Sequence, residues 1–527
     1  MRRLWRPRLV LPLLLGLFLL RIISTYRVFS DTTDEQSHIL AGLEVLERGK
    51  YEFEPQHPPL ARVAVAALPY FVAGLRGQGR RSLWWDGPWA THDESFYWKT
   101  LALARAGNLV FAVLLLGFVY HWSRLLGGDN AAAAAGALAA CCPNLIAHAG
   151  LATVDLAAAA TFLMAAFYFW RWSEDPRLRH CLGAAAAFSL AMLSKFSAAA
   201  FLPPLAVLYF LMGQRKHWRA RLPQAAAFCL LTGVILWAGY GFDIGPVTPS
   251  GHRHVSAFAM GSESSIPSRV TAAVEHRVLP APKLWQGLID VASHNQEGHF
   301  AYLLGRTSQQ GWWYYFPIAV GLKTTLPLLA LAALGGWLTA RGSGRYLVAG
   351  AAVVLAAAMA SNLNIGIRHV LPAYPFLTIL GAGVFAARAG RALRVAAMAL
   401  LGWHVVESAA AHPDYLAYFN QIASGREEQY LADSNLDWGQ DLGRLAAFVR
   451  ENRIPTIQVS YSGSADPGML VGPPARPLVW RSPQPGWIAV SANHRIGIGV
   501  APADSAWLRN HQPVAHVGKS IWLYFLR

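Results

Sequence analysis

The acidic pair Asp34-Glu35 follows the first apolar run of the chain, and His38 lies four residues beyond Asp34. Residues four apart share one face of a helix, so the Asp34 carboxylate and the His38 imidazole can point the same way. A carboxylate in such a position can accept a proton from a reacting hydroxyl group. Acids are also favoured in the first turn of any helix, so the pair alone does not establish catalysis.

The sequence around this pair predicts a helix start. Thr33 can cap the helix, with Gln36 at the capping-box position, and Gly49 fits the helix end. Tyr51 and His57 follow, just before another apolar stretch. The segment therefore gathers acidic, basic and aromatic polar side chains beside a hydrophobic surface.

Several cations lie within or beside apolar runs, where a charge is costly and commonly functional. Lys195 sits in LSKFS between two short runs, Arg368-His369 follow another run, and Lys323 lies inside a third. These positions suit the binding of an anionic group such as a phosphate. Each also has a structural explanation, because a lysine can snorkel to the headgroups and Arg368 can pair with a structural acid.

Asp155, in LATVDLAAA, is expected at the start of a helix, where ordinary capping explains an acid. Together with Asp34 and His38 it offers the oxygen and nitrogen ligands that could hold a divalent cation. The spacing of the three residues matches no metal-binding motif. The sequence therefore requires no cofactor and leaves a divalent cation as an alternative.

The composition identifies a polytopic membrane protein. Of the 527 residues, 54% are hydrophobic and only 14% are charged, whereas a soluble protein carries about a quarter charged residues. The net charge of +16 does not point to nucleic acid, because cytoplasmic loops of membrane proteins collect Lys and Arg. About eleven apolar runs approach the roughly 20 residues needed to span a bilayer. They lie at 9–29, 101–120, 130–148, 153–170, 181–197, 198–212, 224–242, 314–340, 346–361, 370–387 and 395–411.

The distribution of charge predicts the orientation. With the N-terminus in the cytoplasm and the first run retained as an anchor, every predicted cytoplasmic segment is basic, as the positive-inside rule requires. These segments are 1–8, 121–129, 171–180, 213–223, 341–345 and 388–394. The loops 30–100 and 243–311 and the tail 412–527 are then outside. The short run 60–75 contains Arg62 and is expected to lie in the outer interface rather than to span.

The tail 412–527 predicts a small extracytoplasmic α/β domain after a transmembrane domain of residues 1–411. A helix is expected near 437–452, and strands are expected at 456–461, 487–491 and 520–525. Asp437, Trp438 and Asp441 could contact an acceptor, although helix capping and docking are the more ordinary roles.

Four motifs in this order resemble C-type membrane glycosyltransferases. The first loop, with Asp34-Glu35, then Gly49-Lys50-Tyr51 and Pro58-Pro59-Leu60, is similar to that of protein O-mannosyltransferases and lipid A aminoarabinose transferases. His57 stands where the latter have Lys. Three later motifs resemble a bacterial branch of phospholipid-carrier-dependent glycosyltransferases. They are GWWYYFP at 311–317, IGIRHVLP at 365–372 and DSNLDWGQDL at 433–442.

The resemblance implies an all-α polytopic fold and inverting transfer of a sugar from a polyprenyl phosphate to a hydroxyl or amine outside the bacterial inner membrane. The acceptor is a lipid, a glycan or a protein. The chemistry then assigns roles to the candidates. Asp34 is the base and Glu35 orients it or binds the acceptor; Lys195, Arg368, His369, Lys323 and His57 bind the donor phosphate; His38, Asp155, Tyr51 and Asp437 bind the acceptor or support the site.

Two other functions fit a membrane protein of this composition. A lipid-linked sugar transporter or flippase would usually place its polar site near the midplane and show repeated halves, whereas no repeat is visible here and the candidates gather toward one side. A non-catalytic scaffold on the same fold would not need Asp34 together with Lys195 and Arg368. Both features favour the enzyme.

Overall fold

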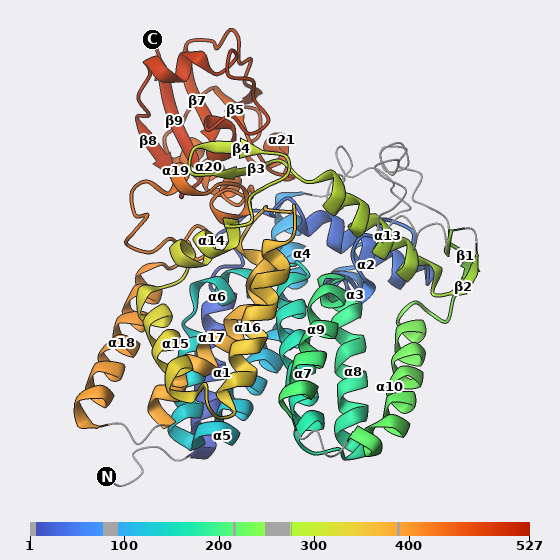
Figure 1. The fold of residues 1–527 in the computed structure, drawn as a ribbon. Helices are drawn as coiled ribbons and strands as arrows, with labels where there is room; N and C mark the ends of the chain where they lie inside the picture. Colours follow the sequence, from blue (N-terminus) through green and yellow to red (C-terminus); the bar gives the residue numbers. More distant parts are fainter. Residues whose placement is uncertain (1–6, 77–92, 214–217, 248–273, 276, 387–389) are drawn as a thin grey trace.

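The computed structural model describes residues 7–76, 93–213, 218–247, 274–275, 277–386 and 390–527, and it shows a helical bundle with a small unit of strands at one end (Figure 1). Apolar helices coincide with the predicted runs, which confirms a mostly helical membrane part. They are α1 (Pro7–Ile23), α4 (Glu94–Ala106), α5 (Leu109–Ala140), α6 (Pro143–Ala149), α7 (Asp155–Glu174), α8 (Leu178–Ser194), α9 (Ser197–Met212), α10 (Trp218–Gly239), α14 (Tyr315–Lys323), α15 (Leu326–Thr339), α16 (Gly344–Met359), η3 (Ile367–Ala373), α17 (Tyr374–Ala386) and α18 (Arg391–Ala410).

Length and hydropathy mark four segments of the described chain as able to cross a membrane: 94–140, 221–239, 367–386 and 391–410. The pair α14–α15 makes a fifth if it is one bent span, and further apolar helices such as α8, α9 and α16 are shorter. The expected count of about eleven spans stays a prediction. Gly128, at φ 77°, breaks α5 inside the predicted loop 121–129, so α5 turns back within the bundle.

The run 314–340, expected as one continuous span, is broken instead. Helices α14 and α15 meet at 113°, with Thr324 and Thr325 between them. The Asn420 side-chain amide donates to the carbonyls of Gly321 (2.6 Å) and Thr324 (2.8 Å), and the Asn420 backbone N–H donates to Leu322. A distant residue therefore satisfies the carbonyls that the break exposes, as the interior of a membrane protein requires.

A layer of shorter elements covers the end of the bundle that carries the strands (Figure 1). It contains α2 (Glu35–Arg48), α3 (Pro59–Leu68) with the π-helical turn η1 (Pro69–Ala73), α13 (Pro282–Glu297), and the two-stranded pairs β1–β2 (Ile244–Pro246, Val278–Pro280) and β3–β4 (Ala301–Leu303, Arg306–Ser308). The run 60–75, expected at the interface, forms α3 and η1.

The predicted cap of α2 is wrong in detail. The helix begins at Glu35, whose carboxylate accepts the backbone N–H of Thr32 (2.8 Å), so the capping contact comes one residue earlier than expected. The Gln36 amide instead donates to Asp31 (2.9 Å) and to the distant carbonyl of Ser464 (2.8 Å). Gly49 ends the helix at φ 63°, as predicted.

The C-terminal unit contains a five-stranded sheet and short helices. Its sheet has the order β6-β5-β7-β9-β8, in which β5 is parallel to both neighbours and β9 is antiparallel to both of its own. The predicted strands are β5 (Ile457–Ser460), β7 (Gly486–Ser491) and β9 (Ile521–Leu526), and the predicted helix is α20 (Leu442–Glu451). The three-residue strands β6 (Ala475–Pro477) and β8 (Ala515–Val517) were not expected, because such short segments carry little periodicity.

Close helix contact in the bundle depends on glycine, as is common between membrane helices. A Cβ added to Gly335 of α15 would lie 1.8 Å from the carbonyl oxygen of Leu380 on α17, whereas one added to the adjacent Gly336 would meet nothing closer than 3.9 Å. These neighbours form a matched pair for measuring how tightly α15 and α17 pack.

We expect Gly335→Ala to destabilise the protein by about 1–3 kcal/mol, because α15 must move away from α17. Gly336→Ala, which places the same methyl group one residue along, should leave thermal stability unchanged or slightly higher. Thermal unfolding of both purified variants in the same detergent measures the difference. Equal melting temperatures for the two variants would contradict this close packing.

Candidate functional site

Asp34 lies at the start of α2 and forms an ion pair with Arg368 of η3. Its side chain is 27% exposed, so the carboxylate can be reached from outside the protein. The Arg368 guanidinium also lies over the ring of Trp438, 4.4 Å from the ring centre. The predicted base is thus held by the predicted phosphate-binding arginine, and an aromatic ring from the C-terminal region supports that arginine.

A second pair joins two more of the predicted site residues. Lys195, in the turn between α8 and α9, donates from Nζ to Asp155 at the start of α7 (2.6 Å). Asp155 is buried, and the Lys195 side chain is 11% exposed. The structure therefore pairs each of these predicted acids with one predicted cation. In this state both cations are neutralised by a carboxylate.

Glu35 occupies an environment quite different from that of Asp34. It is fully buried and accepts two bonds from Arg105, to Nε and to Nη2 (both 2.8 Å). It also accepts the backbone N–H of Ala152 (2.7 Å), only three residues before Asp155. With every lone-pair direction engaged, Glu35 positions the segments that carry the site acids instead of facing an acceptor.

His38 and Tyr51 meet around Arg62 of α3. The Arg62 guanidinium donates to His38 Nδ1 (3.0 Å), to the Tyr51 hydroxyl (2.9 Å) and to the Glu54 carboxylate (2.6 Å). Because Nδ1 accepts, the His38 proton is on Nε2. The His57 ring stands edge-on to the His38 ring, with 5.1 Å between centres.

The electrostatics of the loop residues follow from these contacts. Burial raises the pKa of the Asp34 carboxyl, but Arg368 and His38 outweigh it and hold that pKa below the usual aspartate value. Burial, with Arg62, lowers the pKa of His38 to about 3, so this ring is neutral at pH 7.

His57 also lacks a charge in this state. Burial lowers its pKa well below the usual histidine value, and the charges of Arg62, Lys195 and Arg368 add to the effect. Two of the predicted phosphate-binding cations, Lys195 and Arg368, therefore lie near enough to His57 to influence its charge. His57 offers the site a hydrogen bond rather than a positive charge.

The remaining predicted residues lie around this centre or behind it. His369 follows Arg368 in η3 and is half-buried. Lys323 is fully buried and donates to the carbonyls of Leu416 (2.7 Å) and Asn435 (2.5 Å), so it fastens backbone segments. Asp437 is buried and accepts the backbone N–H groups of Gly439 (3.2 Å) and Asn493 (3.1 Å), which places it in the packing of the C-terminal unit.

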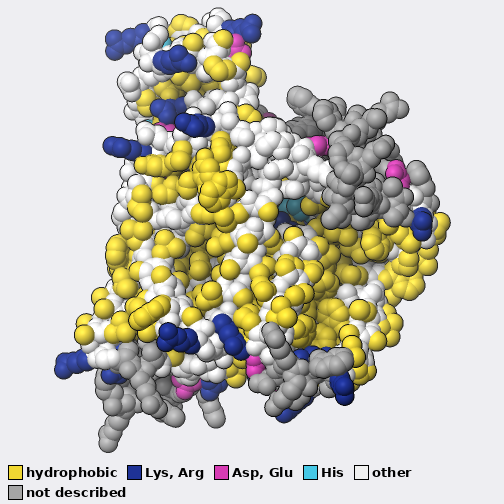
Figure 2. Space-filling model, viewed as in Figure 1, with side chains coloured by type: hydrophobic (Ala, Val, Ile, Leu, Met, Phe, Trp, Pro, Cys, Tyr) yellow, Lys and Arg dark blue, Asp and Glu magenta, His cyan; other side chains and the backbone are white. Residues whose placement is uncertain are grey.

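Figure 2 shows histidine side chains at the surface in a recess above α9 and α16, beneath the covering layer. Among the described residues, no group of three or more His, Cys, Asp or Glu side chains is arranged to hold a metal ion. Asp34, Asp155 and His38 are instead bound to Arg368, Lys195 and Arg62.

Three residues beside the site were not singled out from the sequence. Arg62 could have been found as a charge inside an apolar run. Asp433 lies close enough to Arg368 for that charge to act on it, and burial raises its pKa to about 6. His148 is buried 3.9 Å from Asp155, and neither of its ring nitrogens has a partner among the described residues. Asp433 begins the motif DSNLDWGQDL, whereas no local sequence signal marks His148, because its neighbour Asp155 is set by the fold.

Part of the chain matches a known protein family. Residues 99–238 match the family described as dolichyl-phosphate-mannose-protein mannosyltransferase, a segment that contains both Asp155 and Lys195. A search of curated proteins found no match.

Two solved structures have the same fold over almost the whole chain. ArnT from Cupriavidus metallidurans bound to undecaprenyl phosphate is 14% identical with a TM-score of 0.52, and 97% of each chain is covered. Its apo state is 15% identical, with the same TM-score and the same coverage. The chain therefore has the fold of a C-type membrane glycosyltransferase, and part of it matches a mannosyltransferase family. The fold that the motifs imply is thereby confirmed.

The adjacent acids Asp34 and Glu35 should differ sharply in their effect on stability. Glu35→Gln breaks a fully buried ion pair and strands Arg105, which typically costs about 3–5 kcal/mol. Asp34→Asn removes an acid that is 27% exposed and leaves Arg368 over the Trp438 ring, so its effect should be smaller. Thermal unfolding of the two variants in one detergent measures this. A larger loss for Asp34→Asn would show that the two roles have been assigned the wrong way round.

Proposed function

We propose that this protein transfers a sugar from a polyprenyl-phosphate carrier to an acceptor hydroxyl or amine at the extracytoplasmic face of the bacterial inner membrane, with inversion at the sugar C1. One observation carries the proposal. The pairs Asp34–Arg368 and Asp155–Lys195 come from four separate segments, and Asp155 lies near enough to act on the charges of both Asp34 and Arg368.

The reaction makes demands that this arrangement can meet. The acceptor must lose a proton to a base, and the departing phosphate must be stabilised as the bond to C1 breaks. Asp34 is an ionised, partly exposed carboxylate, and Arg368 and Lys195 supply the positive charge. A site at the end of the spans also lets the carrier's polyprenyl chain stay in hydrocarbon. The solved relative was crystallised with undecaprenyl phosphate, a carrier of this class.

The ion pairs suggest how donor binding activates the base. A donor phosphate entering the site competes with Asp34 for Arg368 and with Asp155 for Lys195. Once the guanidinium turns to the phosphate, the Asp34 carboxylate is released and can accept the proton of the acceptor. The acceptor oxygen or nitrogen then attacks C1 as the C1–phosphate bond breaks, and the electron pair leaves with the lipid phosphate.

The stereochemistry follows from the number of carboxylates available. Retention needs a second carboxylate to attack C1 and form a covalent intermediate. Asp155 is buried against Lys195 and Glu35 is fully bound, which leaves Asp34 as the accessible acid of the three. A single displacement with Asp34 as base inverts C1.

The neutral rings contribute hydrogen bonds. Arg62 fixes His38 with its Nε2–H free, and His57 stands beside it. These groups suit the hydroxyls of a sugar or the oxygens of a phosphate, and a bound phosphate would favour protonation of His57. Tyr51 helps to hold Arg62, so its role is to position that arginine.

The orientation rests on charge. In the view of Figure 2, Lys and Arg side chains lie at the end of the bundle opposite the C-terminal unit and also on that unit, and the face between them is mostly hydrophobic. The rule on charge applies to the short loops between spans, which lie at the former end. The positive-inside rule assigns that end to the cytoplasm, which leaves the ion pairs and the C-terminal unit outside.

We expect Asp34→Asn to lower the turnover number by about 10²–10⁴-fold, because the amide cannot accept the proton. Donor binding should persist or tighten, since Arg368 no longer has a competing carboxylate. Mass analysis of surface lipids and glycans from cells lacking the protein identifies the product, and the variant is then tested for restoring it. Wild-type product levels in cells carrying Asp34→Asn would refute the role of this acid.

We expect Lys195→Ala to raise the KM for the donor at least tenfold, because one phosphate-binding charge is lost. This change also strands the buried Asp155, so the double variant Lys195→Ala/Asp155→Asn serves as the control. It removes both charges and should restore thermal stability without restoring donor use. If donor use recovers together with stability, Lys195 serves only to neutralise Asp155.

A further inference from the structure

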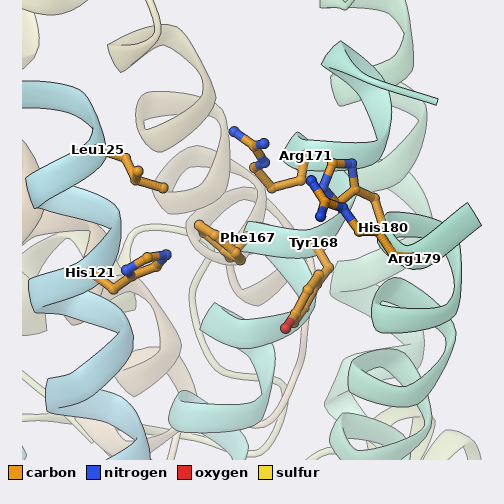
Figure 3. Close-up of a pocket in the computed structure, with 7 residues that line it drawn as sticks. All are labelled: His121, Leu125, Phe167, Tyr168, Arg171, Arg179 and His180. Carbon is orange, nitrogen blue, oxygen red and sulfur yellow. The ribbon is translucent and has the colours of Figure 1, made fainter. Parts of the chain in front are cut away.

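A cavity of about 370 Å³ lies far from the ion pairs, at the opposite end of the bundle. It is an open pocket lined by residues of α5, α7 and α8 (Figure 3). One part of its lining is apolar and consists of Leu125, Phe167 and the Tyr168 ring. Gly183 of α8 lets this ring lie flat, because an added Cβ would come within 2.5 Å of it. The absence of a side chain at Gly183 therefore lets the Tyr168 ring pack directly against α8.

The other part of the lining is basic. In Figure 3 the side chains of Arg171 and Arg179 stand together on one wall, and His121 faces them from α5. His180 donates from Nδ1 to the carbonyl of Asp175 (3.0 Å), which holds its ring in place. The cavity therefore combines two guanidinium groups and two imidazoles with an apolar surface.

These arginines lack the partners that neutralise their neighbours. Asp129 pairs with Arg124 (2.9 Å), Asp175 pairs with Arg177 (2.8 Å), and the Glu174 carboxylate binds the Tyr346 hydroxyl. Within the described ranges, no carboxylate pairs with Arg171 or Arg179. Two unneutralised guanidinium groups in one cavity are the arrangement that binds a phosphate oxygen group.

We propose that this cavity binds the phosphodiester headgroup of an anionic phospholipid from the membrane leaflet opposite the candidate active site. The phosphate lies between Arg171 and Arg179, and an acyl chain follows Leu125 toward the hydrocarbon. Basic pockets between membrane helices at the cytoplasmic face suit such headgroups. The assignment of this face to the cytoplasm rests on the orientation proposed above, whereas the binding of the lipid does not.

The apolar wall favours a lipid over free phosphate. Leu125 is 50% exposed beside the basic groups, although a soluble anion gains nothing from a leucine. The cavity is also larger than one phosphate requires and lies within the size range of small-molecule sites. A phospholipid would contact the basic part of the lining with its headgroup and the apolar part with its acyl chain.

The test uses the full chain purified in detergent, with phosphatidylglycerol or phosphatidylcholine added in mixed micelles. Retained lipid is measured by native mass spectrometry, and affinity is taken from the lipid-dependent rise in melting temperature. The wild type should bind phosphatidylglycerol preferentially. Arg171→Gln/Arg179→Gln should weaken that binding about tenfold or more, given roughly 1 kcal/mol per arginine near a membrane surface.

The matched control is Arg391→Gln/Arg394→Gln, which removes two exposed arginines at the start of α18 and should leave binding unchanged. Arg179 is exposed, so Arg179→Gln alone tests the site even if the double variant fails to fold, and several-fold weaker binding is expected. Equal loss in the control pair, or no loss in Arg179→Gln, would overturn the proposal.

A competition experiment distinguishes binding of a phospholipid from binding of free phosphate. Inorganic phosphate at millimolar concentration should neither displace phosphatidylglycerol nor raise the melting temperature. If it does both, and Arg171→Gln/Arg179→Gln abolishes both effects, the cavity is a site for a soluble phosphate and the lipid assignment is wrong.

Discussion

One buried carboxylate holds the candidate site together. Glu35 binds Arg105 through both of its oxygens, and Arg105 in turn donates to the carbonyls of Tyr26, Phe29 and Ser30. The same carboxylate accepts the N–H of Ala152, so α4, the segment between α1 and α2 and the segment before α7 are tied to one point. A buried charge with every partner in place resists rearrangement, because loss of any one partner leaves the others unsatisfied. This constraint sets where Asp34 and Asp155 begin their helices.

The Asp34–Arg368 pair has a different character. Asp34–Arg368 is partly open to solvent, so its opening costs much less than that of a buried pair. Arg368 also keeps its contact with Trp438, and it can therefore exchange a carboxylate for a phosphate without losing its place. The rigid pair contains Glu35 and the exchangeable pair contains its neighbour Asp34. The fixed position of Glu35 therefore also fixes the backbone that carries the releasable Asp34 carboxylate.

Much of this architecture was predictable from local pattern. Apolar runs marked the helices, Gly49 marked the end of α2, and short strand-like runs marked β5, β7 and β9, because each signal lies within a few residues of its effect. The cost of membrane charge also pointed to Lys195 and Arg368 as candidates. Pairing between distant segments was beyond reach: the bonds of Glu35 to Arg105 and Ala152 join residues about 70 and 117 positions apart. The break at Thr324 escaped for the same reason, since Asn420 supplies the missing bonds.

The C-terminal region is part of the site and not merely attached to it. The carbonyl of Trp438 accepts the N–H of Thr33 (3.1 Å), and the Ser30 hydroxyl donates to the carbonyl of Gln440 (2.9 Å), so the loop carrying Asp34 is laced to residues 438–440. The Trp438 ring in turn packs against the Arg368 guanidinium. The base, its arginine and that aromatic ring thus come from three regions spread over some 400 residues. Because each orients the next, movement of the C-terminal unit relative to the bundle would alter the Asp34–Arg368 pair directly.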